Sequence, residues 1–195
     1  MKTVSMSGSL RENVGKKDAK MNRKNGKVPC VLYGGKDQIH FLANEKDFKD
    51  IIFTPEVCFI DLDINGKQYK ATLQDVQYHP VSDNILHVDF LQIIDDKPII
   101  MSVPIKVVGT SPGVLRGGKL VVKMRKLKVK GLASVLPDDV KIDISPLEID
   151  DYVKVNNLSV KGVEFLNVPT SIVVIIKPTR GVEDPAATAE TEEKK

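Results

Sequence analysis

The stretch "VCFIDLDINGKQYKATLQDV", residues 57–76, is the strongest local structural signal in the sequence. Apolar and polar residues alternate on both sides of Asn65-Gly66. A period of two residues is typical of a strand with one buried face. Asn-Gly favours a two-residue hairpin turn, because both residues tolerate positive φ angles. Residues 57–76 are therefore predicted to form a β-hairpin.

The sequence on either side of this hairpin also favours short strands. In "ILHVDFLQII", residues 85–94, the apolar Leu86, Val88 and Phe90 alternate with His87 and Asp89. The stretches "VPCVLYGG" and "QIHFLA" predict two further strands separated by a glycine turn. "NEKDFKDII", residues 44–52, has the spacing of a short helix with an Asn at its start. Residues 1–94 are predicted to form one compact β unit.

A second unit is predicted to begin at Asp95-Asp96. Residues 95–178 contain several Val- and Ile-rich stretches separated by Pro, Gly and Asp-Asp, which favours a second β domain. Residues 179–195 are rich in Ala, Thr and Glu without apolar periodicity, which predicts a disordered acidic tail. The fold class is therefore mainly β, with two domains and a tail.

Few residue patterns in this sequence indicate a catalytic or metal-binding site. The nucleotide-binding and hydrolase motifs GxGxxG, GxxxxGK[ST], HExxH and GxSxG are missing, and the three histidines lack the spacing of a zinc site. His87 and Asp89 resemble a base and its orienting partner, but no nucleophile accompanies them. Cys30 and Cys58 each lie in an apolar run, as buried or free thiols do. We expect no enzyme activity, no cofactor and no metal.

Targeting signals are equally sparse. The sequence has no apolar run long enough to cross a bilayer and no leader with a small-residue cleavage site. We therefore expect a cytoplasmic protein without a membrane partner.

Positive charge is concentrated near the start of the chain. The net charge of the whole chain is only +3, yet residues 1–36 hold nine Lys and Arg against two acids. Seven of these cations fall in a glycine- and asparagine-rich segment: Arg11, Lys16, Lys17, Lys20, Arg23, Lys24 and Lys27. A solvated connector is one interpretation, but so long a loop between strands is usually functional. The cations of this segment suit contacts with phosphates, which predicts nucleic-acid binding. We expect residues 12–27 to be mobile in the free protein and to become ordered on binding.

Two blocks of the N-terminal unit carry a family resemblance. "LRENVGKKDAKMNRKNGKVPCVLYGG", residues 10–35, and "LQDVQYHPVSDNILHVDFLQI", residues 73–93, resemble the bacterial large-subunit ribosomal protein L twenty-five family, which binds 5S rRNA. The C-terminal "GVLRGGKL", "VKIDISPLEIDDYVKVNNL" and "IVVIIKP" resemble the longer Ctc or TL-five general stress protein subfamily.

The resemblance implies an N-terminal β-barrel with a few short helices, similar to an anticodon-binding domain, and a C-terminal β-rich domain. It implies that the barrel binds an irregular loop of 5S rRNA in the central protuberance of the large ribosomal subunit. The RNA-binding positions carried over by motif are Arg11, Lys16, Lys20, Arg23, Gln74, His87 and Asp89. His79 also matches, with either a contact or a turn-packing role.

This sequence departs from the family pattern at one place in the basic segment. Residues 20–23 are "KMNR", where the family usually has Arg-Arg-Leu-Arg, which lowers the charge and weakens the short helix expected there. Arg23 keeps its match, and Lys20 replaces Arg adequately only at a simple phosphate contact.

A second basic segment, Arg116–Lys130, has seven cations and no acid. It fits a contact with neighbouring rRNA or ribosomal proteins, or an exposed face that protects a sheet edge from aggregation. One alternative function is RNA binding outside the ribosome by a barrel of the anticodon-binding type. The other is a stress-related protein with incidental basic patches.

Overall fold

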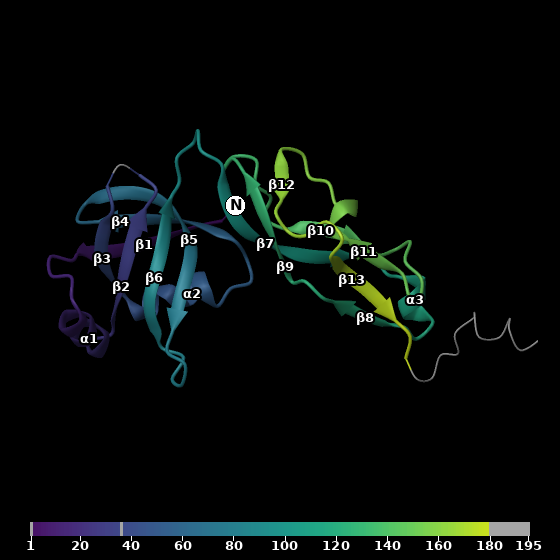
Figure 1. Ribbon diagram of the computed structural model, residues 1–195, viewed down its shortest axis with the longest axis horizontal. Helices are drawn as coiled ribbons and strands as arrows, with labels where there is room; N and C mark the ends of the chain where they lie inside the picture. The colour runs from purple at the N-terminus through teal and green to yellow at the C-terminus, as the bar shows by residue number, and fades with distance from the viewer. Residues whose placement is uncertain (1, 36, 180–195) are drawn as a thin grey trace, which may run out of the picture. The chain divides into compact units, whose positions relative to one another are not determined.

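The structure, a computed structural model, describes residues 2–35 and 37–179 (Figure 1). It divides into two compact units. The first extends to Met101 and includes residues 131–138, and the second comprises residues 102–130 and continues from residue 139. The division therefore falls within a strand, Ile99–Val108, seven residues beyond the boundary expected at residues 94 and 95. The predicted tail lies outside the described residues from residue 180 onwards.

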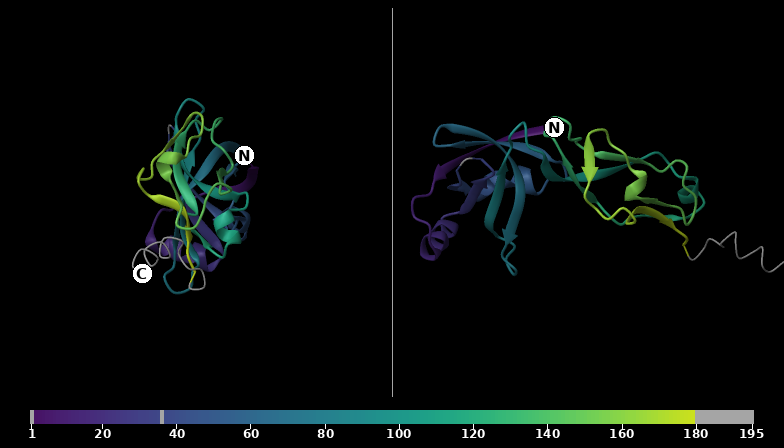
Figure 2. Two further views of the ribbon diagram at one scale, coloured as in Figure 1. Left: turned by 90° about the vertical axis from the view of Figure 1, so that its right-hand side faces the viewer. Right: turned by 45° about the horizontal axis from the view of Figure 1, so that its top comes forward.

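The first unit is a closed β-barrel, as the family resemblance implied (Figures 1 and 2). The order of strands around the barrel is β1-β3-β2-β6-β5-β4. Pairing of β1 with β4 and of β2 with β6 is parallel, and the other pairs are antiparallel. The strands are β1 (Lys2–Leu10), β2 (Lys27–Tyr33), β3 (Ile39–Asn44), β4 (Cys58–Ile64), β5 (Lys67–Tyr78) and β6 (Ile85–Gln92).

The predicted hairpin is confirmed. β4 and β5 pair from Ile64 with Lys67 back to Ile60 with Ala71. Asn65 and Gly66 form the turn with φ angles of 50° and 83°, the positive values that these two residue types tolerate. Asp63 strengthens the turn by accepting a hydrogen bond from the Gly66 N–H at 2.8 Å.

The barrel core contains three phenylalanines that pack together. The ring of Phe90 lies 5.7 Å from Phe41 and 6.4 Å from Phe48 between centroids, and all three are fully buried. A Cβ at Gly8 would lie 2.6 Å from the Phe41 ring, so only glycine fits at this point of β1. Leu10 is half exposed, because β1 ends there.

Three short helices accompany the barrel. The expected helix of residues 44–52 is present as η1 (Glu45–Phe48) followed by α2 (Lys49–Ile52), with Phe48 and Ile51 buried. The third helix, α1 (Lys16–Lys24), occupies the segment that was predicted to be a mobile loop. It lies at the same end of the barrel as the loop between β5 and β6 (Figures 1 and 2).

The second unit is also built from strands, as predicted. One sheet has the order β10-β7-β9-β12 and the other has the order β11-β13-β8. Val103, Leu127 and Ile176 are fully buried in its core. The elements are β7 (Ile99–Val108), α3 (Pro112–Leu115), β8 (Lys119–Val122), β9 (Lys126–Gly131), β10 (Val140–Asp143), β11 (Tyr152–Lys154), η2 (Val155–Asn157), β12 (Val163–Phe165) and β13 (Ile172–Lys177).

Cys30 and Cys58 are buried free thiols, as predicted. Burial raises the pKa of both thiol groups above the ordinary value of 9.0. Among the helices of the described residues, none is long and apolar enough to span a membrane.

Candidate nucleic-acid interface

Polar contacts, rather than apolar packing, attach α1 to the barrel. None of the nine residues of α1 is buried, so the helix lacks the apolar stripe by which most surface helices are recognised. Asp18, Ala19 and Asn22 are its least exposed positions. The loop expected here is a helix over residues 16–24, held by the short-range polar bonds described next, and the mobility predicted for residues 12–27 of the free protein stays a prediction.

Arg11 and Asp18 form the central contact of this attachment. Arg11 Nε donates to Asp18 Oδ2 at 2.8 Å, and Asn22 Nδ2 donates to the same oxygen at 2.9 Å. Arg11 Nη2 also donates to the carbonyl oxygen of Gly15, which precedes the helix, at 3.2 Å. The Arg11 side chain is only 9% exposed. Its guanidinium thus holds the helix in place, and its predicted RNA contact stays a prediction.

Arg23 provides a second attachment point at the other end of α1. Its Nε donates to the carbonyl oxygen of Leu86 at 2.9 Å. Gln77 pairs with His87 and Tyr78 pairs with Ile85, so Leu86 is an extra residue in β6. A bulge of this kind interrupts the ladder and leaves an unpaired backbone group. The guanidinium of Arg23 is therefore fixed against the barrel, and it is exposed to solvent.

The remaining cations of the segment are free for an external partner. Lys16, Lys17, Lys20 and Lys24 are exposed, and within the described chain none of them has an ion-pair partner. Lys20, Arg23 and Lys24 also line one side of a cleft together with Lys27. The predicted residues Lys16, Lys20 and Arg23 thus lie on one helix with a strongly positive surface.

The sheet residues predicted to face RNA lie on neighbouring strands. His87 Nδ1 and Asp89 Oδ1 are 2.7 Å apart, so the pairing expected of these two residues is present. Gln74 is exposed and sits at a bulge, because Leu73 pairs with Phe90 while Asp75 pairs with Asp89. Residues directly opposite each other in antiparallel strands project from the same face. Asp75 and Gln77 therefore share the face of Asp89 and His87, which the sequence analysis missed.

Two opposed carboxylates make this face locally negative. Burial, followed by the charges of Asp89 and Asp75, raises the pKa of the Tyr33 hydroxyl. Burial and the charge of Asp75 likewise raise the pKa of Tyr78. Opposed like charges destabilise a sheet, so their presence on an exposed face favours a role in binding. Carboxylate oxygens suit the amino groups of nucleobases and repel phosphates.

His79 has the structural role that the sequence analysis left open. Its Nδ1 accepts from the backbone N–H groups of Val81 and Ser82, at 3.3 and 3.2 Å. These bonds close the loop between β5 and β6, where Asp83 has a φ of 56°. The imidazole ring is therefore part of the turn.

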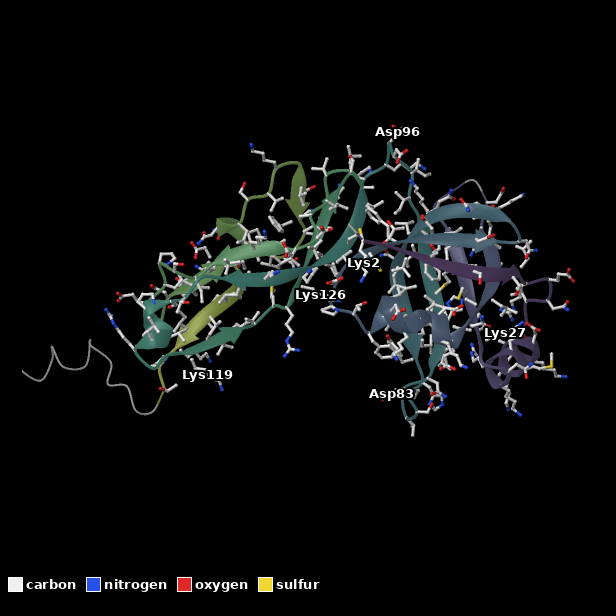
Figure 3. The ribbon with its side chains drawn as sticks, turned by 180° about the vertical axis from the view of Figure 1, so that it is seen from behind. Lys2, Lys27, Asp83, Asp96, Lys119 and Lys126 are labelled. Carbon is white, nitrogen blue, oxygen red and sulfur yellow. The ribbon has the colours of Figure 1, made fainter. Side chains whose placement is uncertain are left out.

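The second basic segment is divided between two sheets. Lys119 lies on β8, whereas Lys126, Lys128 and Lys130 lie on the exposed side of β9, opposite the buried Leu127 and Val129 (Figure 3). Two further lysines, Lys106 on β7 and Lys141 on β10, lie side by side in the same sheet as β9 and are also exposed. The five lysines of this sheet form what we call the lysine face: Lys106, Lys126, Lys128, Lys130 and Lys141.

The charge of the lysine face is only partly neutralised. Lys106 and Lys130 have surface partners in Asp139 and Glu164, at 3.9 and 3.8 Å, and such exposed pairs contribute little energy. Within residues 2–35 and 37–179, no group of three or more His, Cys, Asp or Glu could hold a metal ion.

These features define a class of protein: a β-barrel that holds a cationic helix beside a polar sheet face, followed by a second β unit with a basic face. The same succession of two domains is found in known protein families. Residues 6–90 match the Ribosomal L25p family, and residues 98–180 match the C-terminal domain of ribosomal protein TL5. The chain belongs to the ribosomal L25p family, in the long form that carries the TL5-type second domain.

Several relatives are similar along most of the chain. A protein of Bacteroides thetaiotaomicron is 46% identical over 167 residues, covering 86% of this chain and 85% of its own length. One from Amoebophilus asiaticus is 42% identical over 195 residues, the whole of both chains. One from Phocaeicola vulgatus is 43% identical over 196 residues, covering 97% of this chain and 99% of its own. All three are named "Large ribosomal subunit protein bL25".

Proposed function

We propose that this chain is a structural protein of the large ribosomal subunit, and that its barrel binds 5S rRNA as part of the central protuberance. The observation that carries the proposal is the cationic helix α1, fixed by Arg11 and Arg23 to the barrel that also bears the His87 and Asp89 face. The names of the relatives support the assignment to the large subunit. No catalytic role is proposed.

In this proposal, α1 and the sheet face of the barrel contact different parts of the RNA. Lys16, Lys20 and Arg23 contact phosphates, which orients the protein but carries no sequence information. His87, Asp89 and Gln74 contact base edges, together with Asp75 and Gln77. Because phosphates would be repelled by the two carboxylates, the RNA presents its base amino groups to this face.

Simultaneous contacts with phosphates and with base edges restrict the shape of the RNA. In a regular A-form helix the major groove is too deep and narrow for side chains to enter. A helix such as α1 and a sheet face can reach bases together only where the RNA groove is widened or the bases are irregularly paired. An internal loop of 5S rRNA provides such a site.

In the second unit, the lysine face is proposed to contact neighbouring rRNA or an acidic segment of a ribosomal protein. Its five cations lie on adjacent strands, and only two of them have an acidic neighbour within 4 Å among the described residues. A purely protective role at a sheet edge does not require lysines on three neighbouring strands.

Fractionation of a cell lysate on a sucrose gradient tests the proposed function. We expect the protein to migrate with large subunits at moderate salt and to dissociate as salt is raised, because phosphate contacts release counterions. Absence of the protein from every ribosomal fraction would contradict the proposal. It would favour the alternative of an RNA-binding or stress-related protein that acts outside the ribosome.

A further inference from the structure

A cleft with a volume of about 390 Å³ lies between α1, the start of β2 and the loop that joins β5 to β6. Lys27, which begins β2, and Asp83, in that loop, are labelled in Figure 3. The volume is within the range of roughly 300–1,000 Å³ that small-molecule sites occupy. The basic helix forms one side of the cleft, whereas His87 and Asp89 of the sheet face do not line it.

The cleft combines two kinds of surface. Its floor is apolar and includes Val28 and Ile85, which are 2% and 6% exposed, together with the half-buried Leu86. Four cations line the cleft, Lys20, Arg23, Lys24 and Lys27, and Glu45 is the one acid among the described residues that line it. A ligand that matches both surfaces has a largely apolar part and an anionic part.

Two side chains of the cleft are held in fixed orientations before any ligand arrives. Arg23 is bonded through Nε to the Leu86 carbonyl at 2.9 Å, which positions its guanidinium at the cleft and lowers the cost of ordering it on binding. The His79 ring is fixed by the two N–H groups that donate to its Nδ1. Because Nδ1 accepts, the neutral ring carries its proton on Nε2, which is a donor.

We propose that this cleft binds a single nucleotide, and that in the complex with RNA this nucleotide is a residue extruded from the RNA chain. The base lies on the apolar floor against the ring of His79, within reach of polar groups of Ser82 and Asn84. The phosphate lies on the cations contributed by α1 and β2. Unstacked bases that bind between side chains are the usual means of sequence-specific RNA recognition.

This inference rests on the RNA-binding function proposed above and extends it. Extrusion costs a few kcal/mol of stacking and pairing, and this cost is lowest for bases that are already mismatched. The irregular loop that suits the sheet face is therefore also the kind of RNA from which a base leaves most easily. A free mononucleotide has the same chemistry, so the experiment must separate the two sources.

The test uses the full chain and a 5S rRNA fragment in which single adenines of the internal loop are replaced, one per RNA, by the fluorescent base 2-aminopurine. The Ser82→Leu variant fills the cleft from an exposed position and keeps the backbone N–H that bonds His79. Ser82→Ala is the matched control. Fluorescence anisotropy reports RNA binding, and 2-aminopurine intensity reports unstacking.

We expect the intensity to rise several-fold at one position with the wild-type chain and with Ser82→Ala, and to stay near the free-RNA value with Ser82→Leu. If the RNA binds but no position responds, or if Ser82→Leu gives the same response, the inference is overturned. If the RNA does not bind at all, the proposed function itself fails. A parallel NMR titration with adenosine monophosphate identifies the source: shifts of cleft amides with a silent RNA would overturn the extruded residue in favour of a free nucleotide.

Discussion

Replacement of Asp18 by alanine is expected to unfold α1 while the barrel remains folded. The substitution removes the oxygen that accepts from both Arg11 Nε and Asn22 Nδ2. It leaves the guanidinium of Arg11, which is only 9% exposed, without its acidic partner. No buried apolar side chain of α1 compensates for the loss.

The size of the effect follows from these contacts. A hydrogen bond to a charged group contributes roughly 1.5–3 kcal/mol, and an uncompensated buried donor costs a similar amount. Because opening of the helix lets Arg11 regain water, we use about 2 kcal/mol, which corresponds to a roughly 30-fold rise in the opening equilibrium of α1. A nine-residue helix is also shorter than the roughly 12–15 residues below which isolated helices are marginal in water.

Hydrogen exchange of the free protein measures this opening directly. The amides of α1 should exchange about 30-fold faster in Asp18→Ala, by the conversion above, while those of β4 and β6 keep their wild-type protection. Lys17→Ala is the matched control, since Lys17 is an exposed neighbour on the same helix. Unchanged exchange in α1 would refute the anchoring role of Asp18, and equal losses in helix and barrel would refute its local character.

Three substitutions and one truncation test the remaining assignments. Lys16→Ala should weaken binding to 5S rRNA and to an unrelated structured RNA equally, with the salt slope reduced by about 1, whereas His87→Ala should reduce the discrimination between the two RNAs. Equal effects of both changes would contradict the division between phosphate and base contacts. The folded state raises the pKa of the Cys30 thiol, so the unfolded chain loses this proton at a lower pH than the folded chain. The free energy of unfolding should therefore keep its full value below the ordinary thiol pKa of 9.0 and should fall as pH rises above it. Urea melts on either side of that pH check this, and Cys30→Ala should flatten the decline. A fragment of residues 1–94 contains all six barrel strands and should fold and bind RNA; an unfolded circular dichroism spectrum would show that residues 95–101 and 131–138 are required.

The parts of the fold that the sequence predicts are those set by local chemistry. The hairpin at Asn65-Gly66 needs only a turn and two alternating strands, and the structure has it in the expected register. Closure of the barrel depends on β1 pairing in parallel with β4, between residues such as Met6 and Leu62 that are far apart in sequence. No local pattern encodes that pairing, and the family resemblance implied a barrel without specifying which strands close it.

The same distinction separates the sheet residues that were predicted from those that were missed. His87 and Asp89 alternate with Val88 and Phe90 in the part of β6 that follows the bulge at Leu86, so periodicity alone places them together. On β5, the extra residue at the bulge shifts the alternation between Leu73 and Asp75. Counting by twos from Leu73 assigns Gln74 to the outer face but Asp75 to the core. The bulge reverses the assignment of Asp75.

The attachment of α1 gives the residues of "KMNR" contacts that their pattern in the sequence does not show. Asn22, which replaces the usual family leucine, donates to Asp18 and so supports the helix that it was expected to weaken. Met21, which replaces an arginine, is 58% exposed and takes no part in the attachment. Lys24 and Lys27, two further cations of the segment, line the cleft with Arg23. Hydrophobic periodicity cannot reveal such a helix, because its stability depends on one acid placed between an arginine seven residues earlier and an amide four residues later.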